Sequence, residues 1–362
     1  MANLTQTSAL SRKAIKYGSV GFLLVSVLWY LGVALVNYYI SLHPPPLPPA
    51  SVDFGKLQAI EFPKNESRPQ MVLELPTGVI PTFPDRMRVY YAPTKRSGFA
   101  DPDNATEVAT ALGFLFKPDQ PTESRYIWSN QDQLSSKLDM NIVTGHFVLT
   151  KQWQNNPLIA TFANFVSDKQ VITDTSNSLR KSGILEDDLL GFEKLTYLKS
   201  DAGKLIPALS LSDADFVQLD YFRKNIDEID PESKTKEIKA SYPFYRTDPS
   251  VGLLRVIVSG SKQPNEKIIE MKYSYTFIKY EENGTYPIKT GDEAWQELLT
   301  GGGFVAPTSP MTGEVKIRKI FLAYYDSNVN QKYAMPIYVF LGDKGFAAYV
   351  SAVNDRWIEG GI

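Results

Sequence analysis

The feature that most constrains this chain is an unbroken apolar run near its N-terminus. Residues 17–42 are 26 consecutive positions without a charged side chain. As an α-helix this run would be about 39 Å long, more than the ~30 Å hydrocarbon core of a bilayer. Arg12, Lys13 and Lys16 precede it, and no Lys or Arg occurs in the ten residues that follow. Because basic residues favour the cytoplasmic side, the pattern predicts a single-pass helix in the cell membrane, with residues 43–362 outside.

A cleaved signal peptide is the alternative explanation of this run. The apolar region of a signal peptide normally spans ~7–15 residues and ends at a small-residue cleavage site. This run is longer and lacks such a site, so we favour a permanent anchor. Within the bilayer, the polar side chains of Ser19, Ser26 and Asn37 can hydrogen-bond a neighbouring helix. These three residues are the predicted transmembrane contact with a membrane or envelope protein partner.

A proline-rich segment follows the apolar run. Five prolines occur in the eight residues from His43 to Ala50. Proline restricts φ and lacks a backbone donor, so we expect a polyproline II stalk that separates the following domain from the bilayer. The rest of the 362-residue chain is long enough for two or three compact units. The predicted division is a cytoplasmic tail (1–16), a transmembrane helix (17–42), a proline-rich stalk (43–52) and three α/β units (53–160, 161–240 and 241–362).

A pattern of a short helix, a glycine stop and paired strands occurs three times after the stalk. The predicted helices end at Gly113, Gly183 and Gly301–Gly303, because glycine readily adopts the left-handed conformation that ends a helix. Two earlier extended runs, 71–75 and 87–91, are expected to be strands that enter the first unit. The other predicted strands are 126–128, 138–143, 146–151, 195–199, 205–209, 216–223, 315–325, 333–341 and 346–353.

A long amphipathic strand is predicted between the second and third patterns. Apolar and polar side chains alternate from Ile269 to Phe277, as in a strand with one buried and one solvent-facing side. Asn283-Gly284 is a strong turn dipeptide and predicts a hairpin after this strand. Together with the three helix-and-strand patterns, these features predict an α+β domain built of repeated helix-plus-antiparallel-sheet units.

The composition excludes several classes of function. The chain has no Cys, which excludes disulfides, thiolate catalysis, iron–sulfur clusters and Cys-ligated zinc. Its two histidines, His43 and His146, are 103 positions apart and form no metal-ligand pair. Beyond the first 16 residues, 35 basic and 40 acidic side chains give a net charge of −5, which argues against nucleic acid binding. The absence of Cys in a large external region favours a bacterial cell envelope over a eukaryotic secretory route.

No catalytic motif is present in the sequence. It contains no G-x-S-x-G, H-E-x-x-H, Walker or dinucleotide-binding pattern. His146 stands beside the predicted turn at 144–145, and we interpret it as a cross-strand histidine. Acidic clusters at 186–188, 213–215 and 227–230 lie in polar surroundings that favour solvated surface over the paired carboxylates of a hydrolase. We therefore predict no catalytic residue, no cofactor and no metal, and a carboxylate-dependent envelope hydrolase is the less favoured alternative.

Clustered aromatic residues are the best candidates for a protein contact. Tyr and Trp anchor protein interfaces because they bury a large area at a low cost in conformational entropy. Packing within edge strands and turns is the other interpretation, and it is the one that we favour. The candidates for an exposed contact surface are Tyr242, Phe244, Tyr245, Tyr324, Tyr325 and Trp357.

The third helix-and-strand pattern resembles a known family. The residues that carry this resemblance are Ala294-Trp295, Leu298-Leu299, Gly301–Gly303, the strand 317–325 and the strand 333–340. They are similar to the C-terminal part of YycH/YycI-type proteins, which are single-pass regulators of an envelope-stress histidine kinase in Gram-positive bacteria, built of PepSY-like α/β units. The resemblance extends over residues 290–353 and consists mostly of apolar positions.

The resemblance and the predicted anchor together imply a function without catalysis. The expected role is a regulatory or sensory accessory of an envelope protein, acting through protein–protein contacts outside the membrane. A structural or assembly component of the envelope, or a surface-binding protein, is the rival expectation, in which the helix serves only as a tether. Exchange of the transmembrane helix distinguishes these two roles.

Overall fold

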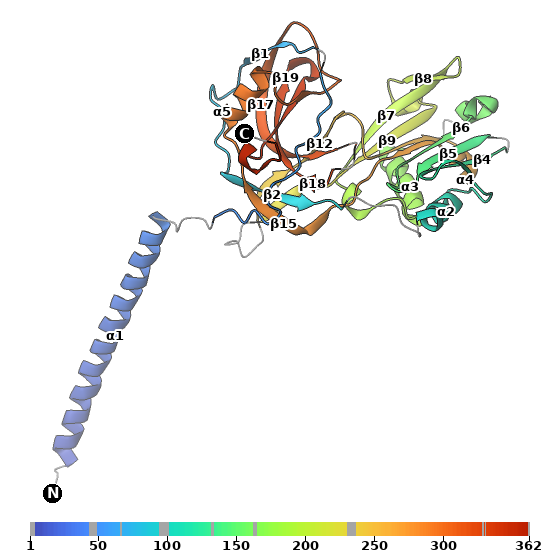
Figure 1. The fold of residues 1–362 in the computed structure, drawn as a ribbon. Helices are drawn as coiled ribbons and strands as arrows, with labels where there is room; N and C mark the ends of the chain where they lie inside the picture. The colour runs from blue at the N-terminus through green and yellow to red at the C-terminus, as the bar shows by residue number, and fades with distance from the viewer. Residues whose placement is uncertain are drawn as a thin grey trace. The chain divides into compact units, whose positions relative to one another are not determined.

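The computed structural model of the chain consists of two compact units, Met1–Pro49 and Ala50–Ile362 (Figure 1). Residues 43–48, which include His43 and four of the five prolines of the predicted stalk, lie outside the described residues. The structure describes residues 4–360 except 43–48, 66, 94–100, 132–133, 162–164, 230–236, 328 and 330.

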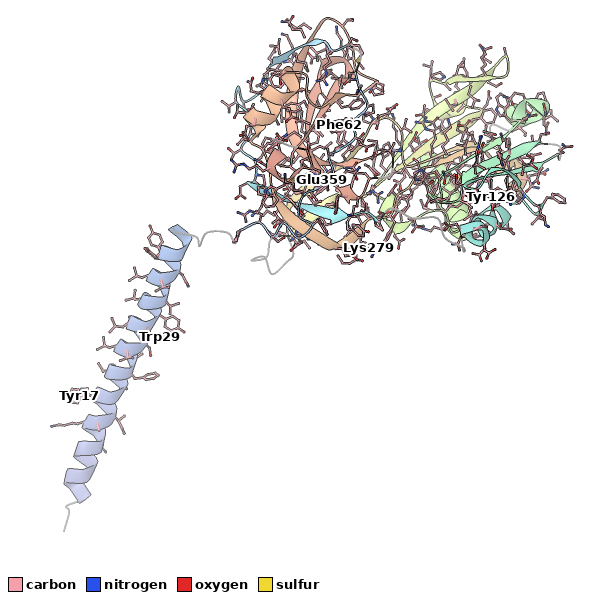
Figure 2. The ribbon with its side chains drawn as sticks, viewed as in Figure 1. Tyr17, Trp29, Phe62, Tyr126, Lys279 and Glu359 are labelled. Atoms are coloured by element: carbon pink, nitrogen blue, oxygen red, sulfur yellow. The ribbon has the colours of Figure 1, made fainter. Side chains whose placement is uncertain are left out.

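The first unit is a single helix, α1 (Leu4–Leu42), of 39 residues. It begins well before the predicted start at Tyr17, because no Gly or Pro interrupts the preceding residues. Its segment Arg12–Tyr39 is 28 residues long and has no buried residue. Figure 2 shows the side chains of Tyr17 and Trp29 projecting outward from this helix. Among the described residues, α1 is the one helix that is long and apolar enough to cross a membrane.

The second unit is an α+β domain dominated by strands, which confirms the predicted fold class at this level. Figure 1 shows helices beside its largest sheet. Those helices are α2 (Asp101–Ala111) and α3 (Asp168–Lys181). The sheet consists of nine antiparallel strands in the order β3 (Asp119–Thr122), β4 (Arg125–Asn130), β5 (Ser136–Asn141), β6 (Phe147–Lys151), β14 (Ile268–Tyr273), β13 (Leu254–Ser259), β9 (Phe216–Phe222), β7 (Phe192–Asp201) and β8 (Lys204–Pro207).

The other strands form three smaller sheets. The six-stranded sheet contains β1 (Gln70–Leu73), β17 (Glu314–Asp326), β19 (Pro336–Gly342), β20 (Ala347–Ser351) and β16 (Phe304–Val305) in that order, with β12 (Phe244–Arg246) also beside β17. The three-stranded sheet is β15 (Lys279–Pro287), β2 (Arg86–Tyr91) and β18 (Tyr333–Ala334), and β10 (Ile226–Ile229) pairs with β11 (Ile238–Tyr242). β1 and β12 pair with β17 in parallel, whereas the remaining pairs are antiparallel.

Two short α-helices and six 3₁₀ segments complete the described structure of the domain. They are α4 (Pro264–Lys267), α5 (Gly291–Leu299), η1 (Trp153–Asn155), η2 (Pro157–Thr161), η3 (Asp187–Leu189), η4 (Leu211–Asp213), η5 (Asp343–Gly345) and η6 (Asp355–Trp357).

The helices begin and end where local chemistry favours it. The side chains of Ser167 and Thr290 accept a backbone N–H hydrogen bond in the first turns of α3 and α5, which satisfies donors that lack a partner within the helix. Gly113, Gly183 and Gly301 follow α2, α3 and α5 at positive φ, in agreement with the predicted glycine stops.

The core of the nine-stranded sheet lies on the face that α2 and α3 cover. Leu138 of β5, Val256 of β13 and Met271 of β14 are fully buried in one cluster. Ala109 of α2 and Leu179 of α3 belong to the same cluster. Because each fully buried aliphatic side chain contributes roughly 1.5–3 kcal/mol, this cluster holds both helices on the sheet.

The sheets do not follow the three predicted units. The nine-stranded sheet takes β3–β6, β7–β9 and β13–β14 from all three of them. β1 and β2 were expected to enter the first unit, but they pair with β17 and β15 of the C-terminal part. This expectation is wrong because strand pairing brings together residues 188 to 244 positions apart, which local sequence patterns do not encode.

Two further local predictions are corrected. Asn283-Gly284 does not form a hairpin turn, because both residues lie within β15 and pair with Tyr90 and Val89 of β2. The amphipathic strand predicted to continue to Phe277 ends at Tyr273 as β14. In both cases pairing with a distant strand determines the backbone conformation in place of the local signal.

Gly303 provides a test of the packing between α5 and β20. It has a φ of +66°, and a Cβ atom placed on it would collide with the backbone carbonyl of Tyr349. We expect Gly303→Ala to lower the free energy of unfolding by more than about 3 kcal/mol, because backbone strain and a collision with rigid main chain add together. Gly301→Ala is the matched control, since Gly301 has a φ of +97° but open space around it. Urea unfolding of both variants checks this, and equal losses of stability would contradict it.

Candidate functional site

A buried arginine lies where the nine-stranded sheet meets strand β17 of the six-stranded sheet. Arg223 directly follows β9, and none of its side chain is exposed. Its guanidinium group donates hydrogen bonds to the Asp188 carboxylate, to Asp326 Oδ2 at 2.9 Å and to the Thr276 carbonyl oxygen at 2.7 Å. These partners come from η3, the end of β17 and the connection between β14 and β15. We call these four residues the Arg223 cluster.

Aromatic rings surround the Arg223 cluster. The guanidinium carbon of Arg223 lies 4.9 Å from the ring centroid of Tyr275 and 5.2 Å from that of Phe244. The Tyr280 hydroxyl donates a 3.2 Å hydrogen bond to Asp188. Although burial alone would lower the pKa of Arg223, attraction to Asp326 and other nearby groups raises it well above the ordinary value. The guanidinium group therefore stays charged, and its neighbours must compensate that charge.

An apolar pocket adjoins this cluster. Its volume is about 440 Å³, and α2 and the helix-covered face of the nine-stranded sheet line it. Val108, Met140 and Phe147 supply aliphatic and aromatic walls, and Tyr273 and Tyr275 continue the wall from the end of β14. A pocket of this size and lining matches small-molecule sites in proteins.

Polar groups gather at one end of the apolar pocket. Burial lowers the pKa of His146, so its imidazole is neutral at neutral pH. Burial, together with the charges of Asp188 and Asp187, raises the pKa of Glu186. Burial likewise raises the pKa of Tyr273, so its phenol stays protonated. This end of the pocket thus presents a carboxylate, a phenol and a neutral imidazole.

A second, larger pocket lies on the opposite face of the same sheet. It has a volume of about 930 Å³ and is lined by polar side chains of β4, β5 and β6. Arg125 makes two hydrogen bonds of 2.9 and 2.6 Å with Asp139, and Lys272 lies 3.1 Å from Glu270. Because these charges already pair with one another at the surface, the second pocket has less specific chemistry to offer.

The six predicted contact aromatics do not form an exposed surface. They are Tyr242, Phe244, Tyr245, Tyr324, Tyr325 and Trp357. Tyr242, Tyr324 and Tyr325 are buried, with 7%, 1% and 2% of their surface exposed. The ring centroid of Tyr324 lies 5.6 Å from that of Phe244 and 6.3 Å from that of Tyr242. The contact-surface interpretation, which requires exposed side chains, is therefore wrong for Tyr242, Tyr324 and Tyr325, because they pack inside the domain. Phe244 and Tyr245 are partly buried.

The remaining candidate, Trp357, belongs to another part of the domain. It packs against Tyr286 with ring centroids 6.3 Å apart. Large exposed aromatic side chains in the described part of the domain occur elsewhere, at Phe116, Phe192 and Phe277, which are 75%, 60% and 54% exposed. Aromatic identity alone does not predict exposure, because Tyr is suited to both cores and surfaces.

The predicted transmembrane contact residues lie on α1. The hydroxyls of Ser19 and Ser26 donate hydrogen bonds to backbone carbonyls one turn earlier, at 3.0 and 2.8 Å. These hydroxyls keep an acceptor lone pair for a neighbouring helix. Asn37 lies near the C-terminal end of α1 with an exposed side chain. The contact with a partner helix stays a prediction.

The acidic residues of the three predicted clusters lie in different environments. Asp188 was expected at the solvated surface, but it pairs with buried Arg223 and only 18% of its side chain is exposed. Asp213 instead lies 3.3 Å from Lys199 at the surface. Asp227 accepts a hydrogen bond from Ser241, and Asp230 lies outside the described residues. Within the described ranges no group of three or more His, Asp or Glu side chains is placed to hold a metal ion.

No protein-family model and no curated protein matches the sequence. Among solved structures, the chain is similar to the crystal structure of an uncharacterized protein from Eubacterium rectale ATCC 33656, determined at 1.45 Å resolution. The similarity covers 73% of this chain and 82% of that chain, with 11% sequence identity and a TM-score of 0.31. Similarity at this level identifies neither a family nor a function, so the function is inferred from the residues of this chain.

Replacement of Arg223 tests the importance of the buried cluster. We expect Arg223→Leu to destabilise the domain by about 3–5 kcal/mol, because it leaves the buried Asp326 carboxylate without its cation. Adding Asp326→Asn to this variant should restore part of the loss. Arg125→Leu is the matched control, because Arg125 also pairs with a carboxylate, Asp139, but with 52% of its side chain exposed. Urea unfolding measures all three, and a loss for Arg223→Leu no larger than for the control would contradict the prediction.

His146 predicts a specific dependence of stability on pH. Burial lowers its pKa below the ordinary value of 6.5, so the unfolded chain binds a proton more readily than the folded one. Stability should therefore fall as the pH drops below about 6.5. His146→Gln should flatten this part of the curve, as measured by thermal unfolding between about pH 5 and pH 7.5. An imidazole NMR titration, assigned with His43→Gln, checks the pKa, and a midpoint at or above 6.5 for His146 would contradict the prediction.

Proposed function

We propose that this chain is a single-pass membrane protein whose C-terminal domain acts outside the cytoplasm as a non-enzymatic regulatory or sensory accessory of an envelope protein. The observation that carries the proposal is the separation of the chain into an unburied apolar helix and a compact α+β domain. A mostly apolar helical segment of 28 residues in which no residue is buried is stable in a bilayer, where lipid surrounds its side chains.

The flanking charges support the proposed orientation. Arg12, Lys13 and Lys16 lie at the N-terminal end of the apolar segment. Basic residues next to a membrane helix favour the cytoplasmic side, so the N-terminus is inside the cell and the domain of residues 50–362 is outside. The absence of Cys from the sequence fits an envelope location in a bacterium.

The proposed lack of catalysis is supported by how the acidic groups are used. Asp188 and Asp326 are engaged by Arg223, and Asp220 accepts a 2.8 Å hydrogen bond from Arg255. A glycoside hydrolase of the usual kind needs two carboxyl groups that face each other across a cleft. Among the described residues that line the apolar pocket, Glu186 is the one carboxylate. We therefore favour binding over hydrolysis.

The resemblance to YycH/YycI-type proteins supplies the regulatory part of the proposal. It rests on apolar residues of α5 and β17–β19, and Trp295, Leu298 and Phe340 among them lie in one buried cluster. The repetition of PepSY-like units remains a prediction from the sequence. A structural or assembly component with the same anchor is the rival role, and it differs in having no requirement for a specific helix.

Exchange of the apolar segment separates these two roles. We expect that replacing residues 17–42 by an unrelated hydrophobic helix abolishes in-membrane cross-linking to the partner, because a regulatory helix recognises its neighbour through specific contacts. A triple variant with Ser19→Ala, Ser26→Ala and Asn37→Leu should weaken the cross-link in the same direction. Cross-linking and co-purification from membranes give the measurement. A partner that is still captured after the exchange would contradict the regulatory role and favour assembly.

A further inference from the structure

The apolar pocket beside α2 carries an inference that does not depend on the proposed regulatory role. Its volume of about 440 Å³ lies within the ~300–1,000 Å³ range of small-molecule sites. Helix α2, strands β5, β6 and β14, the turn 142–146, the segment 183–186 and the connection after β14 contribute to its lining. The site is thus built by several parts of the chain and not by a single loop.

Aromatic rings form one wall of this pocket. The rings of Phe147 and Tyr273 are stacked, with centroids 5.2 Å apart and an angle of 20° between their planes. Tyr275 continues the row at 6.1 Å from Tyr273. Phe277, which is 54% exposed, also lines the pocket. The faces of aromatic rings carry negative electrostatic potential and attract cations.

The charges near the polar end of the pocket are mostly negative. Glu186 lines the pocket, and Asp187 and Asp188 follow it in the chain. Both Glu186 and Asp188 act electrostatically on the Tyr273 and Tyr275 hydroxyls. Among the described residues, the charged groups that act on this end are the carboxylates of Glu186, Asp187, Asp188 and Asp326 and the guanidinium groups of Arg223 and Arg246. Within this described set, four carboxylates against two cations give an excess of negative charge.

We propose that the pocket binds an organic ammonium ion, with the apolar body of the ligand among Val108, Met140 and Phe147 and its charged nitrogen beside Glu186 and the aromatic ring of Tyr273. An aromatic ring next to a carboxylate is a combination that proteins use for such cations. A carboxylate ligand of the same shape would be repelled by Glu186. A neutral alcohol would fill the apolar space but gain no charge interaction.

Three probes of equal chain length test the proposal. They are hexylammonium, hexanoate and hexan-1-ol, titrated against the full chain in lipid nanodiscs, with empty nanodiscs as the blank for partitioning into lipid. Isothermal calorimetry gives the dissociation constants. We expect hexylammonium to bind at least about tenfold more tightly than the other two. Equal affinities of the three probes, or no binding above the blank, would overturn the proposal.

Variants place the binding in this pocket. Glu186→Gln should weaken hexylammonium binding by about fivefold, whereas Asp187→Asn, which removes the same charge from the next residue, should change it less than about twofold. Val108→Phe should block the pocket and abolish binding, and its unfolding curve shows whether the variant is folded. If Asp187→Asn weakens binding as much as Glu186→Gln, only a diffuse negative field attracts the cation and the proposed site is wrong. Unchanged binding in a folded Val108→Phe variant would place the ligand elsewhere and would also overturn it.

Discussion

The charge of Arg223 is the constraint on which the arrangement of the domain depends. Burial of a guanidinium group costs several kcal/mol of solvation free energy. Hydrogen bonds and ion pairs in good geometry must offset this cost. The partners of Arg223 are Asp188, Thr276 and Asp326, which lie far apart in the sequence. Bringing them together requires η3, the connection after β14 and the end of β17 to converge on the end of β9. The nine-stranded sheet and the six-stranded sheet are therefore joined by a polar contact.

Strand β17 extends this constraint through the C-terminal half. It has 13 residues and pairs with β1 and β12 in parallel and with β19 in antiparallel orientation. Its first residues thus pair with β1, and its last residue, Asp326, belongs to the Arg223 cluster. A strand with these partners cannot belong to a unit made only of neighbouring sequence. The domain is consequently assembled from interleaved segments, and its N-terminal strands complete sheets whose other members come from residues 244–351.

Local chemistry in the sequence predicted the parts of this fold that depend on few neighbours. The N-terminal apolar helix, the glycine stops after α2, α3 and α5 and most strands were predicted, because a helix end or an alternating strand is determined within about ten residues. The pairing of β1 with β17 could not be predicted, since any apolar strand fits many partners. Asn283-Gly284 shows the same limit, because pairing with β2 outweighs its turn preference. The candidate site was missed for a related reason: Arg223, Glu186 and Tyr275 acquire their roles only when distant segments meet.

The apolar pocket and the Arg223 cluster are physically linked by the residues that they share. The ring of Tyr275 lies against Arg223 and also lines the pocket, and Thr276 likewise belongs to both. Glu186 stands two residues before Asp188, so a cation beside Glu186 acts on the same carboxylates that compensate Arg223. Because charges interact strongly where water is excluded, the electrostatics of the pocket and of the cluster cannot be independent. The apolar pocket therefore lies beside the buried ion cluster at which the nine-stranded and six-stranded sheets meet.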